Sequence, residues 1–166
     1  TPVVTLTSEP NPSAFLGGVV FTATVSAPSY QVAAGGLGLS AASVEPPTGT
    51  VTFNLDGEVH TVDLDQGVAT ASTNNLNVGE RPIVAEYDAT PNYAAASATY
   101  TQTVTQANSV TALAVPPHPA YWDDDVVFTA TVNYQAAGIS VLKTTAPTGT
   151  VTFTDTTGAI NFTTTL

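Results

Sequence analysis

The sequence predicts an all-β chain that forms two β-sandwiches in tandem, the second of them incomplete. Two strings occur twice: Thr-Gly-Thr-Val-Thr-Phe at 48–53 and 148–153, and Val-Val-Phe-Thr-Ala-Thr-Val at 19–25 and 126–132. Apolar and polar residues alternate in both strings, which is typical of strands with one buried and one wet face. The chain is rich in Thr, Val and Ala, with 12 Gly and 12 Pro as punctuation, which is the composition of an all-β protein.

The charge balance excludes several classes of partner. The chain has 13 acidic residues and two basic ones, Arg81 and Lys143, for a net charge of −11. Phosphate backbones and anionic membrane surfaces attract clustered Lys and Arg, so we expect no nucleic acid partner. No apolar run approaches the roughly 20 residues of a membrane span, so we expect no membrane insertion.

The chain contains no Cys, so we expect no disulfide and no thiol chemistry. A secreted location stays open, because domains of this size can fold without disulfides. The sequence does not begin with Met, shows no signal peptide and starts within a predicted strand. We interpret it as a mature or excised piece of a longer protein.

Turn residues divide the first half of the chain into short strands. The first strand is predicted at 3–7 and ends before Pro10 and Pro12, which cannot donate hydrogen bonds to a sheet. The next strand is the copied string at 19–25. Its inward residues are Phe21, Ala23 and Val25.

The hexapeptide belongs to a strand at 48–55, with Val51, Phe53 and Leu55 inward. Asp-Gly at 56–57 is a strong hairpin signal and returns the chain through 59–64.

Further strands follow at 68–72, from Pro82 to Tyr87, and from Ala96 to Val104, with Leu76 as the apolar plug of the loop at 74–79. Ile83, Ala85 and Tyr87 are the predicted inward residues of the middle strand. Seven or eight short strands in about 100 residues, with turns every 8–12 residues, predict an immunoglobulin-like sandwich over 1–106.

A second sandwich begins near Ala107. One copied string recurs after 107 residues and the other after 100, so the loop between them is seven residues shorter in the second copy. An ungapped alignment places Leu166 opposite Gln66, so that 107–166 hold only the N-terminal part of the repeat. We expect exposed core residues and open strand edges there, because the chain was cut from a longer one or because another subunit donates the missing strands.

A series of motifs runs through the first unit. Pro-Thr-Gly-Thr-Val-Thr-Phe at 47–53 precedes Asp-Gly at 56–57, Gly-Val-Ala-Thr at 67–70, Ile-Val-Ala-Glu-Tyr at 83–87 and Asn-Tyr at 92–93. This order resembles the bacterial Ig-like repeats of group 3. The resemblance covers 1–106 and the start of a second repeat, and it implies stalk, spacer or adhesion modules without catalytic residues. The chain departs from the family pattern at Arg81, where His is usual, and at Ala89 and Thr90, where Gly and Asp are usual.

The densest charge cluster is Asp123, Asp124 and Asp125, in the turn before the second copied strand. Because Ca²⁺ takes carboxylate oxygens, this cluster is a candidate Ca²⁺ site. The alternative is a solvated acidic turn, since the Asp-x-Asp-x-Asp-Gly order of a known calcium loop is missing. We expect no other cofactor.

Two further candidate sites lie in the second unit. Tyr121 and Trp122 are the candidate aromatic platform for a glycan, next to the acidic turn. Asn161 begins the only Asn-x-Thr sequon and is a candidate glycosylation site, with a chance match as the alternative.

No catalytic constellation is present, so we expect no enzyme activity. His60 and His118 stand alone in their units, whereas a triad or a metal centre needs partners. Asp63, Asp65 and Glu86 are the carboxylates that could act as an acid–base pair, but strand alternation places them on the wet face.

Both copies carry similar, nearly uncharged material between the same two strands. A stretch of this kind either folds over its own sandwich or packs on a neighbour. The candidate assembly contacts are Tyr30, Val32, Leu37, Leu39, Tyr134 and Ile139.

These features predict a non-catalytic structural or adhesive module of a secreted or cell-surface bacterial protein, in a filament, stalk or adhesin. The expected partners are other copies of the chain or neighbouring repeats, in a homo-oligomer or filament. The alternative is a carbohydrate-binding or spacer module of a secreted hydrolase, with glycans as partners.

Overall fold

The computed structural model describes residues 1–28, 46–115, 121, 123–135, 146–158 and 160–166. The chain forms two compact units, Thr1–Gln106 and Ala107–Leu166. The described residues form strands and turns, so the all-β prediction is confirmed. No helix able to cross a membrane occurs in the part of the chain that the structure describes.

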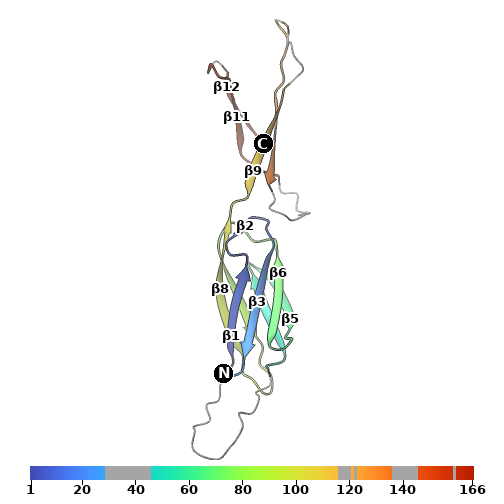
Figure 1. The fold of residues 1–166 in the computed structure, drawn as a ribbon, viewed down its shortest axis with the longest axis vertical. Helices are drawn as coiled ribbons and strands as arrows, with labels where there is room; N and C mark the ends of the chain where they lie inside the picture. Colours follow the sequence, from blue (N-terminus) through green and yellow to red (C-terminus); the bar gives the residue numbers. More distant parts are fainter. Residues whose placement is uncertain (29–45, 116–120, 122, 136–145, 159) are drawn as a thin grey trace, which may run out of the picture. The chain divides into compact units, whose positions relative to one another are not determined.

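Unit 1, Thr1–Gln106, is a sandwich of two sheets (Figure 1). The three-stranded sheet has the order β1-β3-β6 and consists of β1 (Val3–Glu9), β3 (Val19–Ser26) and β6 (Val68–Thr73). The five-stranded sheet has the order β2-β8-β7-β4-β5 and consists of β2 (Ser13–Ala14), β4 (Thr50–Leu55), β5 (Glu58–Asp63), β7 (Gly79–Tyr87) and β8 (Ala96–Thr105).

The two prolines near the N-terminus mark the point where the chain changes sheets. β1 pairs antiparallel with β3, and after Pro10 and Pro12 the chain continues as β2, which pairs parallel with β8. Proline suits this connection because it has no N–H to leave unpaired. Since β2 and β8 are parallel, the chain enters unit 1 at one end and leaves it at the other (Figure 1).

The inward faces of both sheets form one core. The alternation predicted from the sequence is confirmed there: Phe21, Phe53, Ile83 and Ala85 are fully buried, and Leu76 is 3% exposed. The remaining large members of the core are Leu6, Val19, Val25, Val51, Leu55, Tyr87 and Val104.

Two predicted strand starts are wrong. β4 begins at Thr50 instead of 48, because the preceding Gly49 adopts φ 117° and the chain is still turning there. β7 begins at Gly79, three residues before Pro82. Pro82 is tolerated within β7 because it pairs only with Thr101 of β8, while pairing with β4 starts at Ile83.

Unit 2, Ala107–Leu166, contains two antiparallel strand pairs in its described part. One pair is β9 (Asn108–Ala114) with β10 (Thr129–Gln135), and the other is β11 (Thr150–Thr154) with β12 (Asn161–Thr165). The β9–β10 register repeats that of β1–β3 at the expected offset of 107, since Val110 pairs with Asn133 as Val3 pairs with Ser26.

The alignment of Leu166 with Gln66 is wrong. Four residues separate the paired Asn54 and Val59, and six separate the corresponding Thr154 and Asn161, so the second hairpin turn is two residues longer. Leu166 therefore takes the place of Leu64: its N–H donates to the carbonyl of Gly149 at 3.0 Å, as that of Leu64 donates to Gly49 at 2.8 Å.

Candidate functional site

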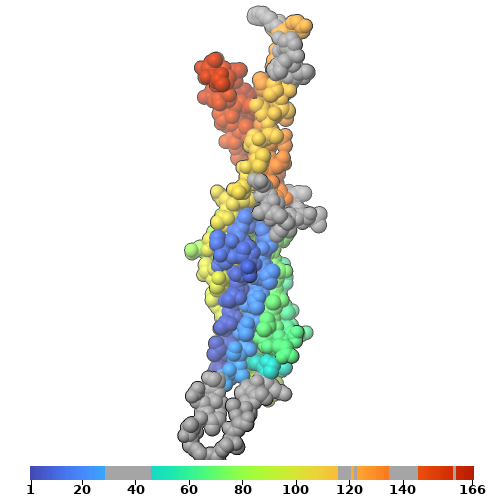
Figure 2. All heavy atoms as spheres, viewed as in Figure 1, coloured from blue at the N-terminus to red at the C-terminus, as the bar shows by residue number. Residues whose placement is uncertain are grey.

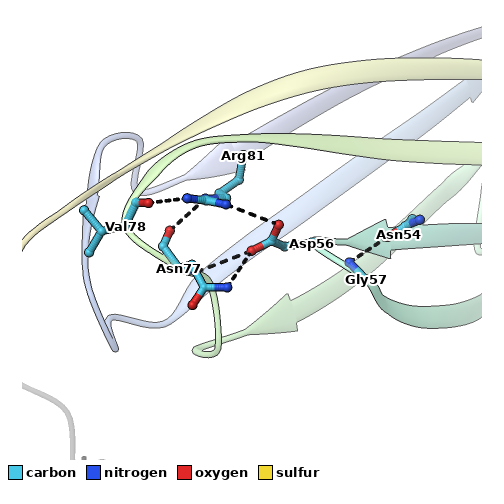
Figure 3. A network of polar contacts seen from close by, with 6 residues as sticks. All are labelled: Asn54, Asp56, Gly57, Asn77, Val78 and Arg81. Carbon is cyan, nitrogen blue, oxygen red and sulfur yellow. Dashed lines mark hydrogen bonds and ion pairs between the residues drawn. The ribbon is translucent and has the colours of Figure 1, made fainter.

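One polar group joins two turns at one end of unit 1 (Figure 3). Asp56 lies in the β4–β5 hairpin turn at φ 57°. Its carboxylate accepts hydrogen bonds from the side-chain amide of Asn77 at 3.2 Å and from the backbone N–H of Asn77 at 3.5 Å. The hairpin turn is thereby attached to the loop that leads into β7.

Arg81 completes this group from β7. Its Nε donates to the carbonyl of Asn77 at 3.0 Å, its Nη2 donates to the carbonyl of Val78, and its Nη1 lies 3.7 Å from Asp56 Oδ1. A planar guanidinium can hold several oxygens in a fixed fork, which a lysine cannot do. We call Asp56, Asn77, Val78 and Arg81 the Arg81 clasp.

The Arg81 clasp serves the fold. The loop that it holds contains Leu76, which is buried in the core of unit 1. The guanidinium is turned onto the protein's own oxygens (Figure 3). Sequence reasoning missed it, because two of its three acceptors are backbone carbonyls, which leave no trace in residue types.

A second polar group is buried between β8 and the segment that connects β1 to β2. Gln102 is fully buried, accepts a hydrogen bond from Ser8 at 2.5 Å, and donates to the carbonyl of Pro10 at 3.0 Å and to Ser13 Oγ at 3.2 Å. Buried amides need such partners to offset their desolvation. Gln102 therefore fixes the point at which the chain changes sheets.

The acidic turn makes hydrogen bonds within itself. The carboxylate of Asp124 accepts a 2.7 Å bond from the N–H of Tyr121, and the N–H of Asp124 donates to the carbonyl of Tyr121 at 3.1 Å. Asp123 adopts φ 78°, and Asp123, Asp124 and Asp125 are all exposed. Among the described residues, no three His, Cys, Asp or Glu side chains are grouped to hold a metal ion. The Ca²⁺ site stays a prediction.

Of the candidate glycan-binding and glycosylation residues of unit 2, the structure describes Tyr121 and Asn161. Tyr121 is 78% exposed, whereas Trp122 lies outside the described residues. Asn161 is the exposed first residue of β12 and pairs with Thr154. The glycan platform and the glycosylation site remain predictions.

One candidate assembly contact is described. Tyr134 lies on β10, where it pairs with Ser109 and is half-buried. The others, Tyr30, Val32, Leu37, Leu39 and Ile139, lie outside the described residues.

The groups considered for catalysis are spread over the surface of unit 1. Asp63, Asp65 and Glu86 are exposed, as strand alternation predicted. His60 is half-buried on β5, and its Nε2 lies 3.0 Å from Oε1 of Glu58. The other carboxylate oxygen of Glu58, Oε2, accepts a hydrogen bond from Thr73 of β6. This group links the two sheets at an edge of the sandwich, and His118 lies outside the described residues.

Comparison with protein families decides what kind of module this is. The model of the bacterial Ig-like domain (group 3) matches residues 6–105. The chain belongs to this family. Neither the curated proteins nor the solved structures yielded a match.

The group 3 match coincides with unit 1 almost from end to end. Group 3 Ig-like domains are generally non-catalytic modules, and bacterial Ig-like domains typically occur in surface or secreted proteins. The best-formed polar groups of this domain, the Arg81 clasp and the Gln102 group, are accordingly ones that hold strands and turns together.

Proposed function

We propose that this chain is a structural module of an extracellular filament, stalk or adhesive surface protein, acting without catalysis as a rigid spacer that contacts neighbouring repeats. The observation that carries the proposal is the parallel pairing of β2 with β8. A domain whose chain enters at one end and leaves at the other adds its own length to a tandem array. A domain with adjacent termini would instead hang from the array as a side group.

The polar groups support a spacer more than a binding protein. Gln102 attaches the first part of the chain to the last strand, and the Arg81 clasp closes the turns at one end of the sandwich. The net charge of −11 favours solubility over non-specific association. Lateral or end-to-end contacts with other copies or neighbouring repeats would come from strand donation and from the nearly uncharged loops.

The test is a measurement of length. Duplicating residues 1–106 within the parent protein should lengthen the surface projection by roughly 34 Å or more per added module, since β8 has ten residues at about 3.4 Å each. The matched control duplicates the same residues with Ala85→Glu, which places a carboxylate in the core and prevents the module from folding. Electron microscopy of negatively stained cells or filaments gives the readout. An unchanged projection length would contradict the proposal.

One observation favours a second function, a carbohydrate-binding spacer of a secreted hydrolase. Tyr121 is 78% exposed, and exposed aromatic rings are usual contacts for sugar faces. Glycan-array binding that is lost in both Tyr121→Ala and Trp122→Ala would support this function. Binding that survives both changes, or no binding by the unchanged chain, would exclude it.

A further inference from the structure

The β4–β5 hairpin turns at Asp56-Gly57, the only Asp-Gly pair in the sequence. An aspartate followed by glycine can rearrange, because glycine has no side chain to keep its nitrogen away from the preceding carboxyl carbon. In the acid form of the carboxyl group, the nitrogen–carbon bond forms while the amide proton and the carboxyl hydroxyl leave as water. Water then opens the resulting cyclic imide to aspartate or to isoaspartate, in which the main chain runs through the former side chain.

In the folded hairpin each reacting group is held by a different partner. The N–H of Gly57 donates to Asn54 Oδ1 at 2.9 Å. The carboxylate of Asp56 accepts two hydrogen bonds from Asn77, at 3.2 Å and 3.5 Å, and lies 3.7 Å from Arg81 Nη1. Figure 3 shows the carboxylate directed toward Asn77 and Arg81, and the nitrogen of Gly57 directed toward Asn54. The reaction therefore requires both groups to leave their partners.

The loop that supplies Asn77 is itself anchored. It follows β6, whose green atoms lie beside the blue atoms of β3 in Figure 2, and the adjacent Leu76 is 3% exposed in the core. The side chains of Asp56 and Arg81 are 19% and 28% exposed. Opening of the Arg81 clasp thus requires local unfolding at this end of unit 1.

The second hairpin of the chain offers an internal comparison. Its turn begins with Asp155, which is followed by Thr156 and not by glycine. A β-branched side chain on the following residue obstructs the attack of its nitrogen on the carboxyl carbon. Asp155 accepts a hydrogen bond from the N–H of Ile160 at 3.1 Å, so its carboxylate is also held within the turn.

We propose that Asp56-Gly57 is a site of isoaspartate formation, and that Asn54 and the Arg81 clasp preserve the aspartate while the hairpin is folded. Isoaspartate adds one atom to the main chain of a two-residue turn, so the pairing of Leu55 with Glu58 would be lost. The clasp would lose its carboxylate as well. The chemistry is the same whatever the module does in the parent protein, and its rate follows the population of the open hairpin.

The test compares the full chain with a synthetic peptide of residues 50–63 during incubation at neutral pH. Electron-transfer fragmentation distinguishes isoaspartate from aspartate at position 56. The peptide has the same turn without the clasp, and an isolated hairpin is only marginally stable in water, so it gives the unprotected rate. We expect isoaspartate in the peptide and a rate in the full chain that is lower by roughly tenfold or more.

Variants of the full chain identify the protecting groups. Asn54→Ala should raise the rate about fivefold, since the loss of one hydrogen bond raises the open population by about that factor. Arg81→Lys should act in the same direction and serves as the second reading if Asn54→Ala does not fold. Gly57→Asn is the matched control: its side chain obstructs the attack, asparagine tolerates positive φ, and no atom lies within 4 Å of the added Cβ. It should form no isoaspartate, as should Asp155.

Three outcomes would overturn the proposal. If neither peptide nor chain forms isoaspartate at position 56, the pair is not reactive. Equal rates in peptide and chain would mean that the fold gives no protection. If folded Asn54→Ala and Arg81→Lys both react as slowly as the unchanged chain, these residues do not protect the site. None of these results bears on the length of the projection, so the duplication experiment judges the spacer function separately.

Discussion

The hydroxyl of Tyr87 at the end of β7 donates a 2.8 Å hydrogen bond to the carbonyl of Thr48, in the turn that leads into β4. Tyr87 is 1% exposed, and the turn contains Gly49 at φ 117°. A bond between a buried side chain and this turn fixes where β4 begins. In the same turn the carbonyl of Gly49 accepts a 2.8 Å hydrogen bond from the N–H of Leu64.

Replacing Tyr87 by Phe should destabilise unit 1 by about 1–2 kcal/mol, because the carbonyl of Thr48 loses its donor in a partly buried place. Chemical denaturation followed by circular dichroism measures this difference. Tyr100→Phe is the control, since the exposed Tyr100 hydroxyl only accepts a bond from Asn11. Equal losses in the two variants would contradict the assigned role.

Gln102→Leu should cost unit 1 about 3 kcal/mol. The substitution keeps the volume roughly constant but leaves Ser8, Ser13 and the carbonyl of Pro10 without their shared partner. The same denaturation measurement applies, with Thr99→Val on the exposed face of β8 as a nearly neutral control. A stability equal to that of the unchanged chain would mean that water replaces the amide at no cost.

Arg81→Lys should loosen the Arg81 clasp although the charge is kept. A lysine cannot donate to the carbonyls of Asn77 and Val78 in the fork that the guanidinium provides, so the loop amides at 76–79 should exchange several times faster. Asp56→Asn removes the long ion-pair contact but leaves an amide oxygen that can accept the bonds from Asn77, so it should have a smaller effect. If Asp56→Asn has the larger effect, the charge holds the loop and the carbonyl contacts do not.

Leu76→Ala should destabilise unit 1 by about 2–5 kcal/mol, since it opens a cavity where a buried side chain packs on the core. Val78→Ala, two residues along the same loop, changes a side chain that is 40% exposed and should stay within about 0.5 kcal/mol. Thermal or chemical unfolding distinguishes the two. Similar values for both would show that the loop contributes little to the core.

Most of unit 1 could be predicted from the sequence because sheet burial follows a period of two, and the copied strings show that period clearly. The buried position of Gln102 was not predicted, because a polar residue at an inward position breaks the alternation of apolar and polar residues. The only signal was that Ser8 and Ser13, its partners, also fall at inward positions. The Arg81 clasp could not be predicted, because backbone carbonyls have no sequence signature.

The error at Leu166 has a different origin. Repeated strings fix the alignment only where they are copied, and the hairpin after the second hexapeptide is not a copy of Asp56-Gly57. Asp155 accepts hydrogen bonds from Thr157 and from the N–H of Ile160, which stabilises a longer turn than the first unit uses. The two extra turn residues shift the alignment of every later residue in unit 2 by two positions. A shift by two leaves the alternation of inward and outward residues unchanged.

The parallel pairing of β2 with β8 has a mechanical consequence. When the two ends of unit 1 are pulled apart, β2 and β8 are drawn in opposite directions along their length. The hydrogen bonds between them, together with the Gln102 group beside them, are then loaded in shear and must break together, whereas bonds in a peeled hairpin break one after another. Tension along the chain therefore meets its resistance at Ser13, Ala14 and Gln102, and Gln102 is the direct cross-strand partner of Arg81 in the β7–β8 pair.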